Sequence, residues 1–395
     1  MLALSKSIVR VTSFTGKELR ELFRRPGVLA SLILGPFSIM LIFGLGYTGS
    51  RQPFDTEIVI PAGVALPTDP GYYQNLGQGR IRVVRVSDDP TGARARLARK
   101  AIDLVVEVPA NAVGELRAGH QTKIDVSWNE IDPVYDQLAH LAVGELVSAL
   151  NTEIIRQVAA KGISLAGGEA PVSISPEVIA QPTTAQTANI APSPPQVINF
   201  FGPAVFALVL QHLAVTLTAL SMVRERLSGQ MDLFRVSPVT STEILLGKYI
   251  AFAVLSLAVS GVVAATLVYL LGVPMLAGWG VFVGIVLLLT FAALGVGLLI
   301  SLISDSERQA VQLSMLILLA SVFFSGFVLP VEDFIGPVQY LSYVLPVTHG
   351  IETLQQAMLR GGVSSTWMLA ALAGIGLLLF FASLLRLRRV LRRAD

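Results

Sequence analysis

The fold of this chain is decided by one stretch, Tyr249 to Ser304, which reads YIAFAVLSLAVSGVVAATLVYLLGVPMLAGWGVFVGIVLLLTFAALGVGLLISLIS. Its 56 residues include no Asp, Glu, Lys or Arg. A soluble helix or strand turns part of its surface to water, whereas each charge placed at the centre of a bilayer costs roughly 2.5–3.5 kcal/mol. One helical crossing takes about 20 apolar residues. The stretch therefore predicts two membrane-spanning helices, joined by a hinge at Gly272–Gly280.

The composition of the whole chain agrees with a membrane protein. Of its 395 residues, 53% are hydrophobic and only 14% are charged, whereas soluble proteins carry about 25% charged residues. The absence of Cys excludes disulfides and thiol chemistry. Four more charge-free apolar stretches predict further spans: Gly27–Gly49, Val197–Met222, Gln309–Val331 and Gly361–Leu385. The predicted fold is an α-helical integral membrane protein with six transmembrane helices.

The basic residues near the predicted spans set the orientation. Six precede the first span, four lie between the second and third spans, and five follow the last span. Because basic loops stay on the cytoplasmic side, both termini are expected inside the cell membrane and residues 50–196 outside. Residues 1–26 are interpreted as a cytoplasmic helix lying on the inner membrane surface, with an ordinary basic flank as the alternative. Residues 386–395 form a basic cytoplasmic tail.

The polar segment between the first two spans is long enough for a domain of its own. Within residues 50–160, apolar and alternating runs predict an external α/β domain. The predicted strands are Glu57–Val64, Arg80–Val86, Ile102–Val108 and Lys123–Trp128. A long helix is predicted over Pro133–Ala159, where apolar residues recur at helical spacing. Residues 161–196 are rich in Gly, Pro, Ser and Thr and predict a linker into the second span.

The chain lacks the sequence signatures of catalysis. It contains no Gly-x-x-x-x-Gly-Lys-Ser/Thr phosphate loop, no Gly-x-Ser-x-Gly elbow and no His-Glu-x-x-His helix. Four scattered His and no Cys make a zinc site improbable. We therefore expect no enzyme, no cofactor and no metal. The one ionisable residue in the middle of a span is His212, interpreted either as part of a transport pathway or as a neutral imidazole bonded to a neighbouring span.

Two shorter segments have distinctive patterns. In residues 223–243, Val223, Leu227, Met231 and Phe234 share one predicted helical face, so this cytoplasmic helix presents an apolar ridge to a partner or rests on lipid headgroups. The second segment lies within residues 244–385, which hold the third to sixth spans. There Pro330 and Pro346 bracket pieces too short to cross a bilayer, which predicts external re-entrant helices over residues 330–360.

The order of these segments resembles the ABC type-2 permeases. Arg224–Gly229, followed by Ser237–Val239, is similar to the cytoplasmic coupling region of that family. Ser325–Gly361 resembles its paired external helices before the last span, and Lys17–Arg20 resembles its interfacial elbow helix. The large external domain resembles one subgroup of exporter permeases. One departure is Gln230, where many members of the family place Thr.

The resemblance implies a function and a set of partners. Such a chain is the permease subunit of an ATP-driven ABC exporter, paired with a second permease copy as a homodimer or heterodimer and driven by a separate ABC ATP-binding subunit. Its substrate is expected to be amphipathic (a drug, a lipid or a lipid-linked compound), carried between spans one, two and five in contact with membrane lipid, without nucleic acid. The residues implied to contact the ATP-binding subunit are Arg224, Glu225, Arg226, Leu227, Gly229, Met231 and Phe234.

Two other classes of function stay open at this stage. A membrane receptor would bind a ligand with residues 50–159 and signal inward. Against this, no cytoplasmic stretch is large enough for a signalling domain. A cell-surface protein would share the permease fold without an ATPase partner. Binding of an ATP-binding subunit separates the exporter from both.

Overall fold

The structure, a computed structural model, describes residues 38–47, 52–62, 64, 66–73, 79–111, 115, 118, 120–161, 178, 180–236 and 240–392. The chain divides into two compact units, of which one is Ser50–Phe200 and the other comprises Met1–Gly49 with Phe201–Asp395. The predicted interfacial helix, residues 1–26, lies outside the described residues. Of the predicted first span, residues 38–46 are described and helical.

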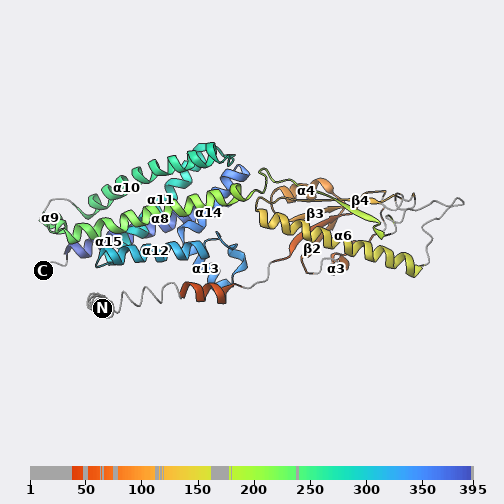
Figure 1. Ribbon diagram of the computed structural model, residues 1–395, viewed down its shortest axis with the longest axis horizontal. Helices are drawn as coiled ribbons and strands as arrows, with labels where there is room; N and C mark the ends of the chain where they lie inside the picture. Colours follow the sequence, from red (N-terminus) through yellow and green to blue (C-terminus); the bar gives the residue numbers. More distant parts are fainter. Residues whose placement is uncertain are drawn as a thin grey trace, which may run out of the picture. The chain divides into compact units, whose positions relative to one another are not determined.

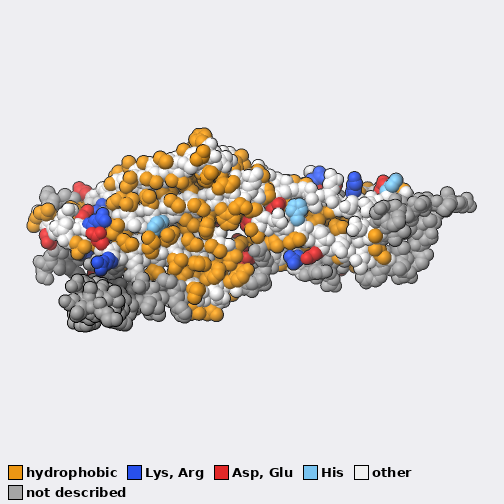
Figure 2. All heavy atoms as spheres, viewed as in Figure 1, with side chains coloured by type: hydrophobic (Ala, Val, Ile, Leu, Met, Phe, Trp, Pro, Cys, Tyr) orange, Lys and Arg blue, Asp and Glu red, His pale blue; other side chains and the backbone are white. Residues whose placement is uncertain are grey.

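The larger unit consists of helices (Figure 1). Its long helices are α8 (Val197–Leu227), α10 (Ser241–Ala265), α11 (Gly278–Ile303), α12 (Glu307–Phe324) and α15 (Thr366–Arg392). Within the described residues, these five are long and apolar enough to cross a membrane. Figure 2 shows hydrophobic side chains over most of the visible face of this unit, with charged side chains gathered at the end that carries α9 (Gln230–Val236). The tail predicted to begin at residue 386 is helical as far as Arg392.

The predicted hinge between the third and fourth spans is present. α10 continues as one π-helical turn, Thr266–Leu270, and the chain then reverses before α11 begins. Gly272 and Gly278 adopt left-handed φ angles of 72° and 78°, which residues with a Cβ rarely adopt. At its other end α10 starts with a capping box, in which Thr240 accepts from the backbone N–H of Glu243 and the Glu243 carboxylate accepts from that of Thr240.

α11 lies at the centre of the helical unit. Leu289, Leu294 and Leu298 are fully buried, and glycines allow the neighbouring helices to approach closely. A Cβ added to Gly297 would clash with the Thr218 hydroxyl and the Val215 carbonyl oxygen of α8. Small residues serve the same purpose at other membrane-helix interfaces, where backbones must approach closely.

Two short helices precede α15, as the prolines predict. They are α13 (Gly336–Val344) and α14 (Pro346–Gln355), and α14 continues as a π-helical turn, Gln356–Arg360. Ten residues span only about 15 Å, so neither helix alone crosses a bilayer. The carbonyl oxygens of Ala357 and Met358 accept hydrogen bonds of 3.0 Å from the backbone N–H groups of Ala277 and Leu276. Protein groups therefore satisfy carbonyls at this helix end, as a lipid environment requires.

The α/β unit is built on a five-stranded mixed sheet in the order β2-β1-β3-β4-β5. Its strands are β1 (Phe54–Val59), β2 (Ile81–Ser87), β3 (Leu104–Glu107), β4 (Thr122–Trp128) and β5 (Thr183–Asn189). Strands β1 and β2, β1 and β3, and β4 and β5 run parallel, whereas β3 and β4 are antiparallel. The first four strands lie where the alternating sequence predicts them, with ends shifted by a few residues.

Helices cover both faces of this sheet (Figure 1). The long helix α6 (Pro133–Lys161) packs Ala142 and Leu146 on the face that carries Ile58 of β1. The shorter helix α4 (Pro90–Ala98) packs Leu97 on the opposite face, which carries Val59. Successive strand residues point to opposite faces, which explains why apolar residues are adjacent in β1 and β3. A single turn of helix, α3, spans Pro70–Tyr73.

Strand β5 corrects the predicted linker over residues 161–196. Its sequence, TTAQTAN, has no large apolar side chain, and only its first residue is buried, so the hydrophobic pattern gives no sign of it. Long-range contacts hold it in place. It pairs with β4 along its length, and the amide of Asn151 on α6 bonds the backbone N–H and C=O of Thr183 at 2.8 and 3.0 Å.

Candidate coupling site at the end of helix α8

The segment predicted as one amphipathic coupling helix is divided in the structure. α8 runs through Leu227 without a break, so Val223–Leu227 is the last part of the second long helix and not a separate element. Gly229 then adopts a left-handed φ of 76°, which ends the helix, and the short helix α9 follows. The prediction of one continuous helical face over these residues is wrong because the glycine changes the helical phase.

This break alters which apolar side chains are exposed. Met231 is only 4% exposed and belongs to the core of the helical unit, against which Phe234 also packs. Leu227, in contrast, is 62% exposed, Leu233 65% and Val236 83%. We call these three residues the apolar end surface. Leu227 is thus confirmed as exposed, whereas Met231 and Phe234 contact the protein interior, and the sequence did not indicate Leu233 and Val236.

The last charged residues of α8 each contact a different helix. Arg224 Nε lies 3.2 Å from Glu307 Oε2 at the start of α12. Both side chains of this pair are largely exposed, and such pairs contribute only about 0–1 kcal/mol. This contact joins α8 to α12 weakly.

Glu225 makes a more buried ion pair. Its Oε1 lies 2.5 Å from the Nζ of Lys248 on α10, and the side chains of Glu225 and Lys248 are 20% and 11% exposed. Lys248 also donates to the Oγ of Ser221, one turn earlier on α8. Glu225 therefore joins α8 to α10 through a mostly buried ion pair.

Arg226 holds the end of α11. Its two terminal nitrogens donate to the backbone carbonyl oxygens of Ser304 and Ser301, at 3.0 and 2.9 Å. Carbonyls in the last turn of a helix have no partner within the helix and carry partial negative charge. A guanidinium supplies two donors in a fixed geometry, which suits such a site. Arg226, another residue of the predicted contact set, therefore bonds the end of α11 within the same unit.

We call Arg224, Glu225 and Arg226 the α8 clamp. Successive residues of an α-helix point about 100° apart, so three in a row can contact three neighbouring helices. Here those neighbours are α12, α10 and α11. The clamp thus fixes the end of α8 to three other helices, beside the exposed apolar end surface.

The middle of α8 carries a second polar site. The buried amide of Gln211 donates to the Oγ of Ser321 on α12 at 2.8 Å. Its neighbour His212 has a buried Nδ1 with no hydrogen-bond partner among the described residues. The polar contact between helices is therefore made by Gln211 and not by the predicted His212. Buried polar groups in a membrane segment are costly, so this pair is a second candidate for a functional role.

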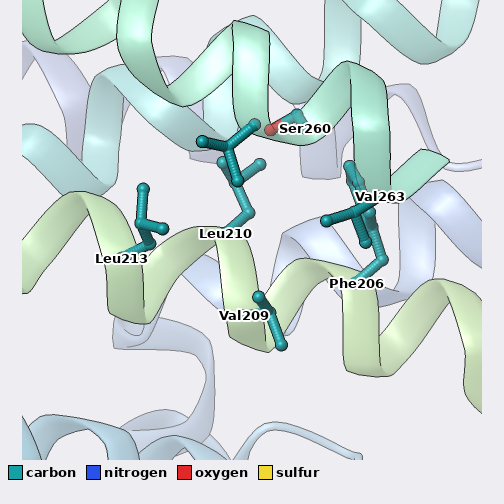
Figure 3. A pocket seen from close by; sticks show the side chains of 7 residues that line it. Phe206, Val209, Leu210, Leu213, Ser260 and Val263 are labelled. Atoms are coloured by element: carbon teal, nitrogen blue, oxygen red, sulfur yellow. The ribbon is translucent and has the colours of Figure 1, made fainter.

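A shallow groove separates α8 from α10 (Figure 3). Its lining residues are Phe206, Val209, Leu210, Leu213, Val259, Ser260 and Val263. Its free volume of about 10 Å³ is room for roughly one water molecule, whereas ligand pockets measure about 300–1,000 Å³. The groove is therefore too small for a ligand in this conformation. Across the described part of the chain, no three His, Asp or Glu side chains are grouped to hold a metal ion.

Five helices of the described part of the chain are long and apolar enough to cross a membrane, which defines a multi-pass membrane protein. The ABC-2 family transporter protein family matches residues 26–385, which is nearly the whole chain. The chain belongs to this family. It is embedded in a membrane, crosses it several times and acts in transport. Membership also implies a partner ATP-binding subunit, because chains of this family are the membrane subunits of ABC transporters.

Several curated relatives are similar along much of their length. The chain is 27% identical over 359 residues to "Probable multidrug ABC transporter permease YbhS" of Escherichia coli (strain K12), covering 90% of this chain and 89% of YbhS. It is 28% identical over 291 residues to "Inner membrane transport permease YhhJ" of the same strain, covering 72% and 73%. A shorter match, 25% over 206 residues, is to "ABC transporter G family member 20" of Dictyostelium discoideum. No solved structure matches the chain.

Proposed function

We propose that this chain is the permease subunit of an ATP-driven exporter that moves an amphipathic substrate out across the cell membrane. Membership of the ABC-2 family supports the subunit type. The name of the relative YbhS, a multidrug transporter permease, supports the outward direction and the drug-like substrate. The basic flanks support an orientation with both termini, the α8 clamp and α9 in the cytoplasm, and with the α/β unit and helices α13 and α14 toward the outside.

One observation carries the proposed partnership with an ATP-binding subunit. The three residues of the apolar end surface are exposed: Leu227 is the last residue of α8, and Leu233 and Val236 lie on α9. Helix α9 lies at the end of the helical unit where charged side chains gather (Figure 2). Large exposed apolar side chains outside a bilayer indicate a protein interface. In the proposed orientation this surface faces the cytoplasm, where an ATP-binding subunit docks, while the clamp residues keep it fixed to the bundle.

A second permease copy completes the proposed transporter, because such permeases work as pairs and the groove found among the described residues is small. The groove beside α8 is too small for a drug or lipid. A pathway between two copies, lined by residues 27–49, α8 and α12, would place the Gln211–Ser321 pair near the substrate. Mostly apolar helices with isolated polar groups suit an amphipathic substrate better than an inorganic ion.

Co-purification tests the proposal. A tagged chain is expected to retain an ATP-binding subunit, identified by mass spectrometry and by nucleotide hydrolysis. Leu233→Asp and Val236→Asp are each expected to reduce the retained subunit at least tenfold, because a carboxylate enters the apolar interface. Leu141→Asp is the matched control, since Leu141 is 57% exposed on α6 of the other unit.

Two results would contradict the proposal. If the wild-type chain retains no ATP-binding subunit under conditions that keep it folded, a receptor or cell-surface role is favoured instead. If the Asp variants retain the subunit at the wild-type level, docking uses another surface. Accumulation of a fluorescent drug by inside-out vesicles then checks the direction, since an exporter fills such vesicles on addition of ATP.

A further inference from the structure

The contact between Arg226 and the end of α11 links two long helices of the helical unit, α8 and α11. Arg226 belongs to the last turn of α8, and its guanidinium bonds the carbonyl oxygens of Ser301 and Ser304. Both acceptors are backbone atoms, so the contact follows the position of α11 itself and not that of a mobile side chain. Ser304 is fully buried, which leaves this end of the helix little freedom to move independently of α8.

The start of α12 lies close to the same contact along the chain. After Ser304, only Asp305 and Ser306 precede α12, which begins at Glu307. Ser306 caps that helix by accepting from the backbone N–H of Gln309, and the Gln309 side chain accepts from the backbone N–H of Asp305. The connection is therefore short and internally bonded. A displacement of Ser304 would pass directly to α12, which carries Ser321 of the Gln211–Ser321 pair.

The other two clamp residues cannot replace this link. The Arg224 contact with Glu307 is largely exposed and is therefore weak. Glu225 contacts α10, which is not part of the α11–α12 connection. Within the clamp, only Arg226 bonds the end of α11. The backbone N–H of Val223 also donates to the Ser301 Oγ at 3.1 Å, but Arg226 bonds Ser304 as well, the last residue before the connection.

We propose that Arg226 is a positioning residue for transport, which makes the α11–α12 connection follow the end of α8 when an ATP-binding subunit pushes on the apolar end surface. This inference rests on the proposed function. It separates two roles within one short segment: Leu227, Leu233 and Val236 bind the partner, and Arg226 conveys the movement to the helices beside the pathway.

The test compares coupling with binding in the reconstituted complex. Arg226→Ala is expected to retain the ATP-binding subunit and ATP hydrolysis within about twofold, while substrate transported per ATP falls at least tenfold. Arg226→Lys keeps the charge but loses the two-pronged geometry. Its substrate transported per ATP is therefore expected to lie between the values of the wild type and Arg226→Ala. Arg386→Ala is the matched control, with a ratio of substrate transported to ATP hydrolysed within twofold of the wild type, because Arg386 is exposed on α15 and belongs neither to the clamp nor to the apolar end surface.

A distance measurement adds a readout that loss of stability alone would not change. Because the chain contains no Cys, spin labels can be placed on Ser228→Cys and Arg308→Cys, two exposed positions on either side of the contact. In the wild-type background we expect the label distance to stay constant when nucleotide binds, since both positions move as one body. In the Arg226→Ala background we expect the distance to change with nucleotide.

The outcomes separate this inference from the proposed function. Wild-type transport per ATP and a constant label distance in Arg226→Ala would overturn it, while leaving the docking proposal intact. Loss of the ATP-binding subunit from the wild-type chain would overturn both. If the Ala variant does not accumulate in the membrane, Arg226→Lys decides, and a wild-type ratio in that variant overturns the inference.

Discussion

The ammonium of Lys248 on α10 lies 2.5 Å from a carboxylate oxygen of Glu225 near the end of α8, and both side chains are mostly buried. Burial makes this pair sensitive to the loss of either partner. The charge that remains would be left in a poorly solvated place without its counter-ion, which costs about 3–5 kcal/mol when the pair is fully buried. Since these side chains retain some exposure, a smaller cost is expected here.

We therefore expect Lys248→Met and Glu225→Gln each to lower the unfolding free energy by about 1–3 kcal/mol. The reversed pair, Glu225→Lys with Lys248→Glu, should recover at least half of that loss, because opposite charges again face each other. Thermal denaturation of the purified variants in detergent measures the effect. If the reversed pair loses as much unfolding free energy as the two single variants together, the two charges do not interact.

The contact between α11 and α8 at Gly297 predicts a steric effect. A methyl group at this position would overlap the Thr218 hydroxyl and the Val215 carbonyl, so Gly297→Ala should force the two helices apart and destabilise the protein by about 1–3 kcal/mol. Gly284→Ala, on the same helix, is the matched control, since no atom lies within 4 Å of the added Cβ. The melting temperatures of the two variants should differ clearly. Equal values would mean that α8 and α11 are less tightly packed than the structure indicates.

The α/β unit contains a buried carboxylate whose charge is held by an arginine. Burial alone would raise the pKa of Glu57, but hydrogen bonds from Arg96 and Ser87 and the Arg96 charge outweigh it, and the pKa lies below its ordinary value near 4.5. The Arg96 contact is two-pronged, at 2.6 and 2.8 Å. A lowered folded-state pKa contributes stability that is present above the unfolded-state pKa and is lost as the pH falls through the folded-state value.

Glu57→Gln should consequently make strand β1 less stable at pH 7, by about 1–3 kcal/mol, and no less stable than the wild type near pH 3. Hydrogen exchange of the β1 amides in the full-length protein, followed between pH 7 and pH 3, measures this. Glu107→Gln is the control, because its partner Arg94 is largely exposed. A constant difference between Glu57→Gln and the wild type over that range would argue against the ion pair.

Glu352 on α14 predicts the opposite pH dependence. Burial, reinforced by the nearby charge of Glu332, raises its pKa to about 7. The folded state then binds this proton more tightly than the unfolded state, so stability is expected to fall as the pH rises from about 4.5 to 7 and to change little beyond. Glu352→Gln should be more stable than the wild type at pH 8, by an amount on the order of 1–3 kcal/mol, and equal to it at pH 4.

Melting temperatures across this pH range check the prediction. Glu332→Gln removes the neighbouring charge and should shift the transition to lower pH without abolishing it. A wild-type profile as flat as that of Glu352→Gln would show that the carboxyl is already ionised at pH 5.

The features that the sequence predicted well are those set by local patterns. The charge-free run from Tyr249 required membrane helices, and Gly272 marked the reversal between two of them, because bilayer thickness limits helix length. The apolar strands β1 to β4 were also visible, since their side chains fill the core between α4 and α6. Strand β5 was not, because its polar residues are held by pairing with β4 and by Asn151 rather than by burial.

The candidate coupling segment differs in the structure from the single amphipathic helix that its sequence predicts. No local pattern reveals these ion pairs and hydrogen bonds, because the partners lie far away along the chain: 23 residues from Glu225, 83 from Arg224 and 78 from Arg226. The break at Gly229 shifted the helical phase, which exposed Leu233 and buried Met231. The sequence did contain one signal of this helix end, Gly229, since a left-handed glycine ends many helices.

Crosslinking from Leu233 tests the central claim most directly. Leu233→Cys would be the only thiol in the chain, so a bifunctional thiol reagent applied to the purified complex reports on this position alone. The account predicts that it joins the chain to a nucleotide-binding subunit, whereas Leu141→Cys on the α/β unit does not. Absence of that product, together with labelling of Leu233→Cys by a membrane-impermeant thiol reagent added outside intact cells, would contradict it.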